Sequence, residues 1–243
     1  MSNMRLVVAW QNPKSREWIP IGNLYYEDKC YKFCYVKGII KAKEVGFIPF
    51  TKMNDIKAVY VADKIFPQFA NRLLAKSRPE YESYQRWLRL DKNSTPLDEL
   101  AKNNGARVTD SIELYMIPKK QEKYIVEFFS HGISHLPHNY QERVKKLEAG
   151  EKLYLVQDLQ NEYDSNALLI RTKDPVELVG YVPRIYAPDF SKLIQHNAEL
   201  KIKQINHDSL MQFQLLCEFS ADWTKDFKPF NTDSFEVIST SLQ

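Results

Sequence analysis

The chain has 243 residues, of which 44% are hydrophobic and 27% are charged, and its formal net charge is +3 at pH 7. A chain of this length and composition can bury a substantial core and can form two modest domains. It contains no run of about eighteen apolar residues, which excludes a membrane-spanning helix. The stretch Met1–Arg5 leads into a strand-like run and lacks the apolar core of a secretory signal.

The cysteines indicate a reduced, cytoplasmic protein. Their number is odd and no Cys-x-x-Cys pair occurs, which argues against both a disulfide framework and a zinc knuckle. The three are Cys30, Cys34 and Cys217.

Three histidines have a spacing that could ligate a metal, namely His131, His135 and His138. However, Pro137 indicates that this segment is a loop, and no Cys or acid completes a ligand set. The sequence therefore predicts no metal site, and it predicts no cofactor.

In chain order, the first 120 residues predict strands followed by helices and a returning strand. Helices are expected from Pro67 and over Tyr81–Leu90. A third helix begins at Thr95, where a hydroxyl cap precedes Pro96 and the acid Asp98. The lysine-rich run 37–43 is interpreted as a solvated edge. Alternating apolar residues predict strands over Arg5–Trp10, Trp18–Leu24, Tyr31–Val36 and Ser111–Ile117.

The second half predicts a small barrel, because short strands separated by polar turns outnumber the helices. A capping box of Asn139 and Glu142 is expected to start a helix that stops at Gly150. Another helix is expected from Pro188. The expected strands are Tyr124–Phe129, Leu153–Leu159, Ala167–Ile170, Leu178–Val182, Leu200–Ile205 and Met211–Phe219.

These elements predict an α+β protein. Residues 1–120 are expected to form a small α+β domain with an antiparallel sheet and helices. Residues 121–219 are expected to form a β-barrel with two helices, and residues 220–243 a C-terminal tail that straps the fold.

The order of elements in residues 1–120 resembles the small N-terminal subdomain of HipA-type bacterial serine/threonine kinases. The resemblance rests on Tyr31-Lys32-Phe33-Cys34-Tyr35, Phe66-Pro67-Gln68-Phe69 and Pro96-Leu97-Asp98-Glu99-Leu100. The kinase core of that family is absent, and no Gly-rich phosphate loop or catalytic-loop motif occurs in a chain with seven glycines. We therefore expect no enzyme.

Two motifs in the second half resemble the HIRAN domain, which occurs in some DNA-repair helicases and in stand-alone bacterial proteins. The family pattern Asn-Pro-Tyr-Asp-x-Asn-Ala appears as Asn161-Glu162-Tyr163-Asp164-Ser165-Asn166-Ala167. The later Gly-Tyr-hydrophobic-Pro pattern appears as Gly180-Tyr181-Val182-Pro183, followed by Arg184. With its flanks the resemblance covers Tyr124–Phe219. It implies a barrel related to the OB and SH3 classes.

The HIRAN resemblance implies a non-catalytic module that captures the 3′ end of single-stranded DNA. By position, Tyr163 would stack on the terminal base, Asp164 would accept a hydrogen bond from the free 3′-hydroxyl, and Asn161 would shape the turn. Stacking of a base on an aromatic ring contributes about 1–3 kcal/mol and does not depend on sequence.

Three further residues complete the implied site. Arg184 would contact a backbone phosphate, Tyr181 would supply another polar aromatic, and Phe129 would cover the opposite face of the base. In this sequence Glu162 stands where the family has Pro, and Phe128 stands where an Arg is expected.

The charge distribution favours a local binding site over a broad basic surface. Residues 1–120 hold 21 Lys and Arg against 13 Asp and Glu, a net charge of +8. Residues 121–243 hold 13 against 18, a net charge of −5. Since bulk neutralisation of phosphate requires a basic domain, DNA contact by the second half must depend on a few residues.

Two alternatives remain open. From the residues alone, Tyr163 and Asp164 also fit a satisfied turn, in which Asp164 bonds backbone amides and Tyr163 packs on the barrel. For the whole chain, some HipA-type toxin–antitoxin systems carry the small subdomain as a separate polypeptide that docks on the kinase toxin and restrains it. This resemblance implies a HipA-like kinase as an alternative partner.

Overall fold

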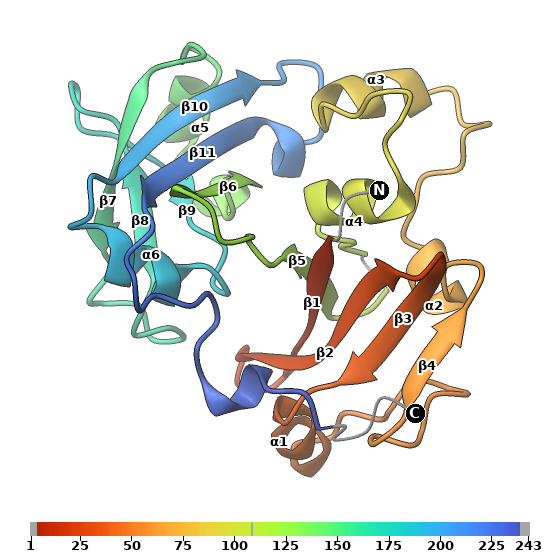
Figure 1. Cartoon of the computed structure of the whole chain (residues 1–243). Helices are drawn as coiled ribbons and strands as arrows, with labels where there is room; N and C mark the ends of the chain where they lie inside the picture. The colour runs from red at the N-terminus through yellow and green to blue at the C-terminus, as the bar shows by residue number, and fades with distance from the viewer. Residues whose placement is uncertain (1–3, 108, 239–243) are drawn as a thin grey trace. The chain divides into compact units, whose positions relative to one another are not determined.

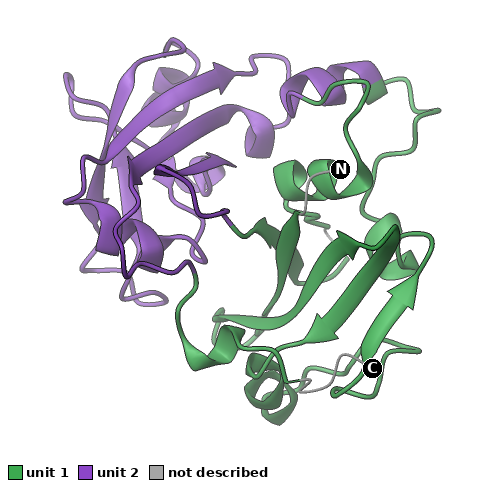
Figure 2. Ribbon diagram, in the orientation of Figure 1, with its two compact units in different colours: residues 1–81, 90–117, 230–243 green, residues 82–89, 118–229 purple. Residues whose placement is uncertain are grey.

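The computed structural model describes residues 4–107 and 109–238, and it divides the chain into two compact units (Figures 1 and 2). Unit 1 comprises residues 1–81, 90–117 and 230–243, and unit 2 comprises residues 82–89 and 118–229. Each unit therefore includes a segment from the other half of the sequence: a short helical segment joins unit 2, and the C-terminal segment joins unit 1. The α+β class is confirmed.

Unit 1 contains a five-stranded antiparallel sheet in the order β4-β3-β2-β1-β5. Every strand expected in the first 120 residues is present, and β4 is an addition at the edge. The strands are β1 Arg5–Gln11, β2 Trp18–Glu27, β3 Cys30–Tyr35, β4 Val59–Ala62 and β5 Ile112–Met116. The helices of this unit are α1 Gly38–Glu44, α2 Pro67–Ala70, α4 Pro96–Asn103 and the 3-10 turn η3 Asp233–Phe235.

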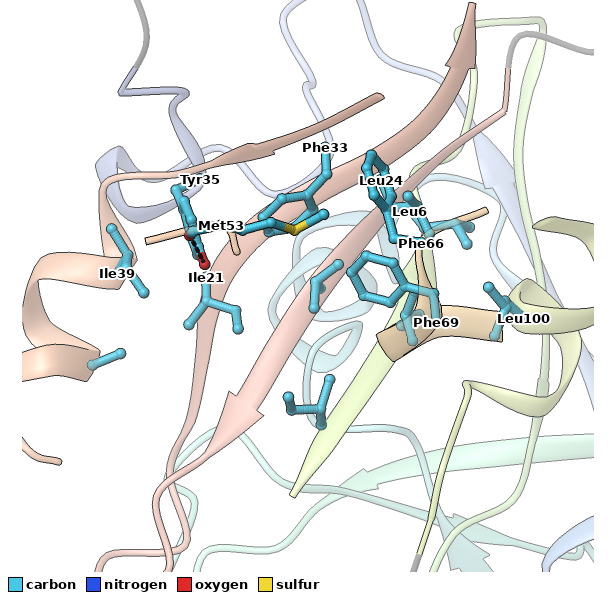
Figure 3. Packing of buried hydrophobic residues seen from close by; sticks show 14 of the residues in the cluster. Leu6, Ile21, Leu24, Phe33, Tyr35, Ile39, Met53, Phe66, Phe69 and Leu100 are labelled. Carbon is cyan, nitrogen blue, oxygen red and sulfur yellow. Dashed lines mark hydrogen bonds between the residues drawn. The ribbon is translucent and has the colours of Figure 1, made fainter. Parts of the chain in front are cut away.

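The core of unit 1 lies between this sheet and the short helices (Figure 3). Phe33 of β3 is fully buried and contacts Phe69 of α2 with ring centroids 5.6 Å apart. The buried hydroxyl of Tyr35 is satisfied, because it donates to the Met53 carbonyl at 2.8 Å and accepts from the Phe50 amide at 2.9 Å. The aromatic strand motif of the sequence thus builds the hydrophobic core.

Helix α4 begins as the sequence predicts. The Thr95 hydroxyl accepts from the Asp98 amide, and the Asp98 carboxylate accepts from the Thr95 amide at 2.7 Å, which completes a capping box. Asn104 ends the helix in the left-handed conformation with φ of 54°.

The lysines of residues 37–43 are exposed, as the sequence predicts, but the segment forms helix α1, which was not expected. Ile39 and Ala42 of this helix are fully buried, while Lys41 pairs with Glu17 at the surface. A Cβ on Gly38 would lie 2.1 Å from the Pro20 carbonyl oxygen, so glycine allows the helix to start against β2. Beside it, Val36 forms an isolated bridge with Val237 of the C-terminal segment.

Unit 2 contains a six-stranded antiparallel sheet in the order β6-β11-β10-β7-β8-β9. All six strands expected in the second half are present, although Met211–Phe213, expected to begin the last strand, forms a 3-10 turn instead. They are β6 Lys123–Phe129, β7 Lys152–Gln157, β8 Leu168–Arg171, β9 Leu178–Tyr181, β10 Glu199–Ile205 and β11 Leu215–Asp222. The helical elements are α3 Tyr81–Trp87, η1 Ile133–His135, α5 His138–Val144, α6 Ala187–Leu193 and η2 Met211–Phe213.

The sheet of unit 2 curls so that its first and last strands meet just beyond β6. His131 and Tyr181 exchange two backbone hydrogen bonds, of 2.9 and 2.8 Å. The Ser130 hydroxyl donates to the Val179 carbonyl at 2.8 Å. Gly180, with φ of +126°, permits this approach, because a Cβ there would lie 2.0 Å from Ser130 Oγ.

Helix α3 is joined to the barrel through the turn between β10 and β11. Trp87 Nε1 donates to Asp208 at 2.9 Å, and Arg86 pairs with the other Asp208 oxygen at 2.5 Å. Asn206 is 4% exposed, and its Nδ2 donates to the carbonyls of Trp87 at 3.1 Å and Phe213 at 2.7 Å.

The capping box expected at Asn139 and Glu142 is wrong. Helix α5 starts at His138 with Pro137 as its N-cap and has no side-chain cap bond. Pro137 has φ of −52°, so its ring already sets the chain for the turn that follows. Glu142 instead pairs with Lys145 at 2.7 Å, and the helix ends at Val144 before reaching Gly150.

Within residues 4–107 and 109–238, every helix is too short or too polar to cross a lipid bilayer.

We expect Gly180→Ala to destabilise unit 2 by at least about 1 kcal/mol more than Gly150→Ala, because the new methyl group overpacks the barrel seam. Both glycines have positive φ, of +126° and +92°, but no atom lies within 4 Å of a Cβ built on Gly150. Urea denaturation measures the free energy of unfolding of both variants. Because both substitutions introduce backbone strain, the difference between their losses reports the steric clash at Gly180. Equal losses of stability would contradict the role assigned to Gly180.

Replacing Asn206 by Ala removes the amide donor of the buried Phe213 carbonyl and of the partly buried Trp87 carbonyl. We expect the free energy of unfolding to fall by about 1–3 kcal/mol. Asn139→Ala, an exposed position on α5, is the matched control and should leave stability nearly unchanged. Thermal and urea unfolding measure both variants, and an Asn206→Ala variant as stable as the control would show that α3 is not anchored through this side chain.

Candidate nucleic-acid interface

The Asn- and Asp-rich turn between β7 and β8 is held by its own backbone. The Asp158 amide donates to the Ala167 carbonyl at 2.9 Å, and the Ala167 amide donates to the Asp164 carbonyl at 3.1 Å. Within this loop, Asn161 Oδ1 accepts from the amides of Tyr163 at 3.1 Å and Asp164 at 3.0 Å. Asn161 therefore shapes the turn by replacing backbone partners with its side chain.

The Asp164 carboxylate is fixed in place on both sides. Its Oδ1 accepts from the Asn166 amide at 3.0 Å, and its Oδ2 lies 3.1 Å from Arg184 Nε. The Asp164 side chain is 12% exposed and that of Arg184 is 26% exposed. Since a carboxylate offers about four acceptor positions, these two contacts leave it able to accept a further hydrogen bond.

Arg184 connects the end of the Gly-Tyr-Val-Pro segment to the turn. Besides its ion pair with Asp164, it donates through Nη2 to the Tyr163 carbonyl. The guanidinium thereby holds the backbone of the turn and its acid at the same time, a geometry that the flat fork of Arg favours.

The Tyr163 side chain projects from this rigid turn and is 63% exposed. Leu159, in the same loop, is 83% exposed. A large aromatic side chain with this exposure contributes little to burial, and its ring is accessible to a base.

Tyr181 lies at the barrel seam, and its hydroxyl donates to Asp158 Oδ2 at 3.0 Å. Burial raises the pKa of the Tyr181 phenol, and the hydrogen bond with Asp158 and the charge of Asp158 act in the same direction. At neutral pH the phenol therefore remains protonated and joins β9 to the start of the turn. Asp158 was not among the expected site residues, because the sequence pattern predicts a strand over Leu153–Leu159, whereas β7 ends at Gln157.

Phe129 lies in the core of the barrel. It is 4% exposed, and its ring packs edge-on against Phe213 with centroids 5.3 Å apart. Its neighbour Phe128 is 3% exposed and packs against Phe190 at 5.6 Å. The structure thus brings together Asn161, Tyr163, Asp164 and Arg184, adds Tyr181 through Asp158, and places Phe129 among buried side chains.

The three histidines belong to different local structures. His131 takes part in the seam, His135 ends η1, and His138 begins α5. Across the described ranges, no group of three or more His, Cys, Asp or Glu residues is arranged to hold a metal ion.

Comparisons with known proteins concern unit 2. Residues 123–224 match the family model for the HIRAN domain. Among solved structures, a protein from Lactobacillus plantarum is 16% identical, with 41% of this chain and 96% of that chain covered and a TM-score of 0.32. The HIRAN domain of human HLTF is 13% identical, with 41% and 74% covered and a TM-score of 0.30. No match was found among curated proteins.

The family match coincides with the barrel and includes both sequence motifs. The HIRAN domain expected in the second half of the chain is supported by this family match at residues 123–224.

Proposed function

We propose that the HIRAN domain of this chain captures the 3′ end of single-stranded DNA and distinguishes a free 3′-hydroxyl from a phosphorylated end. The observation that carries this proposal is the exposed Tyr163 ring, 63% accessible, on the same turn as the fixed Asp164 carboxylate. An aromatic face and an oriented acceptor are the two groups that a terminal nucleoside requires.

Tyr163 acts as the stacking platform. Its backbone is held by Asn161 and Arg184, so binding a base orders little more than the ring itself. A preorganised ring loses less conformational entropy on binding than a ring on a mobile loop. Stacking is indifferent to base identity, which suits recognition of any 3′ end.

Asp164 distinguishes a 3′-hydroxyl from a 3′-phosphate at the end of the strand. A 3′-hydroxyl can donate to the carboxylate, whereas a 3′-phosphate brings two negative groups together. Two unit charges about 4 Å apart repel by about 1 kcal/mol in water and by about 4 kcal/mol at an effective dielectric constant of 20. Arg184 neutralises part of this charge and offers a cation for the phosphate of the preceding nucleotide.

The acidic balance of residues 121–243, −5 in all, supports a short contact with the strand. A long basic groove would neutralise many phosphates and make affinity fall steeply with salt. The proposed contact with a strand end involves few phosphates, so we expect affinity to fall weakly with salt.

The test compares a fluorescent single-stranded oligonucleotide ending in a 3′-hydroxyl with the same oligonucleotide ending in a 3′-phosphate. By fluorescence anisotropy, the 3′-hydroxyl form should bind more tightly. Tyr163→Ala should weaken its binding by about 1–3 kcal/mol. Asp164→Asn should bring the affinities for the two ends together, since the asparagine side chain carries no charge.

Leu159→Ala is the matched control, because it removes another exposed side chain of the same loop. Circular dichroism of each variant verifies folding. The end-capture proposal would be contradicted if the unmodified protein bound both oligonucleotides equally and Asp164→Asn left both affinities unchanged.

Replacing Glu162 provides a second test, in which the affinity for DNA is expected to rise. Glu162 is exposed, and it adds a negative charge next to Tyr163. Glu162→Gln should strengthen binding of the 3′-hydroxyl oligonucleotide severalfold at low salt, with the gain fading as salt increases. Glu148→Gln, an exposed acid outside this turn, should not change affinity. Anisotropy at two salt concentrations measures both, and a Glu162→Gln variant no tighter than Glu148→Gln would contradict a DNA path beside this residue.

Docking on a HipA-like kinase remains a prediction for the first 120 residues. The residues that carry the resemblance mostly build the core: Phe33, Phe69 and Leu100 are fully buried. They characterise a scaffold and do not form a contact surface, so DNA-end capture is the function that the accessible residues favour.

A further inference from the structure

Unit 1 contains a pocket of about 410 Å³ that none of the sequence motifs explains. It lies where the ends of β2 and β3 meet the segment that leads into α4, and its lining includes Tyr26, Tyr31, Asp63, Asn93, Leu97 and Asp98. Small-molecule sites typically have volumes of about 300–1,000 Å³, so this pocket can hold a small ligand.

Two tyrosine rings form the wall of the pocket. Tyr26 and Tyr31 are cross-strand partners on β2 and β3, and their rings meet edge to face with centroids 5.0 Å apart. Both side chains are only partly buried. The T-shaped pair keeps a ring face directed away from its partner, and a ring face attracts cations through its quadrupole.

The charged groups in the lining are both acids. Asp63 and Asp98 contribute carboxylates, and among the described residues that line the pocket there is no Lys, Arg or His. Among the described residues, the Asp63 carboxylate accepts a long contact of 3.6 Å from the Cys30 thiol, which is a weak donor. Asp63 is exposed, so its carboxylate can pair with a ligand at the pocket mouth.

Helix α4 does not offer the pocket an anion site, although its first turn lies in the lining. The Asp98 carboxylate already accepts from the Thr95 amide at 2.7 Å and from the Thr95 hydroxyl at 2.6 Å. An acid thus stands at the positive end of the helix dipole, where an anionic ligand would otherwise bind.

From these observations we propose that the unit 1 pocket binds a small organic cation, a protonated amine carried on an aromatic or aliphatic body. The ammonium group lies between a tyrosine face and the Asp63 carboxylate, and the body of the ligand contacts Leu97 and the adjoining apolar lining. Cation–π attraction and carboxylate pairing act together on the same charge, whereas an anion meets repulsion from both acids. This site is independent of the DNA-end site in unit 2.

The test uses three probes of the same shape and different charge: phenethylammonium, 2-phenylethanol and phenylacetate. Isothermal titration calorimetry at pH 7 on the full chain should give tightest binding for phenethylammonium, weaker binding for 2-phenylethanol, and the weakest for phenylacetate. Asp63→Asn should weaken phenethylammonium at least about fivefold and leave 2-phenylethanol unchanged. Tyr31→Leu should also weaken phenethylammonium.

Glu44→Gln is the control, because this exposed acid lies on α1 outside the lining. Circular dichroism verifies that each variant folds. No phenethylammonium binding at millimolar concentration, or binding of phenylacetate as tight as phenethylammonium, would overturn the proposal. The amine could belong to a free small molecule or to a lysine side chain of a protein, and titration with a backbone-capped lysine distinguishes the two. Tighter binding of the capped lysine than of phenethylammonium would overturn the assignment to a free small molecule.

Discussion

The two backbone hydrogen bonds between His131 and Tyr181 close the sheet of unit 2, and the candidate DNA site depends on them. They fix β9 against the chain that leaves β6, at a distance that only a glycine at position 180 permits. Once β9 is fixed, the Tyr181 hydroxyl reaches Asp158 at the start of the turn. Three residues after Tyr181, Arg184 reaches Asp164 inside the turn. The Gly-Tyr-Val-Pro-Arg segment and the Asn-Asp turn are therefore one structure, in which the seam positions the site.

The charges of the chain restrict how this site can work. A net negative charge does not favour binding through the release of many counterions from a nucleic acid. The domain can gain affinity from a terminus, because a terminus presents a base face and a hydroxyl that no internal nucleotide offers together. In the proposed mode of binding, the ion pair of Asp164 and Arg184 would keep an acceptor in place while neutralising part of the carboxylate's charge.

Sequence patterns predicted the parts whose signal is local. Alternation located the strands, and Thr95 with Asp98 located the start of α4, because both signals involve residues that contact each other directly. Helix α1 was missed, since two β-branched residues follow Gly38 and the helix is stabilised by burying Ile39 against distant strands. The cap at Asn139 failed because Pro137 started the helix earlier. The links from Tyr181 to Asp158 and from α3 to Asp208 join residues far apart in sequence, which no local pattern records.

In the turn at residues 158–167, the contacts that stabilise the backbone do not involve the exposed Tyr163 ring. Asn161 satisfies two amides, Asp164 satisfies a third, and Arg184 holds both the acid and the Tyr163 carbonyl. None of these contacts uses the Tyr163 ring, which remains 63% exposed. A turn stabilised in this way would form equally well with a small polar residue at position 163, because no burial is gained from the aromatic side chain. The folding of the turn therefore does not explain the ring. In the proposed mode of binding, a 3′-terminal nucleoside would use the ring through its base and the neighbouring carboxylate through its hydroxyl.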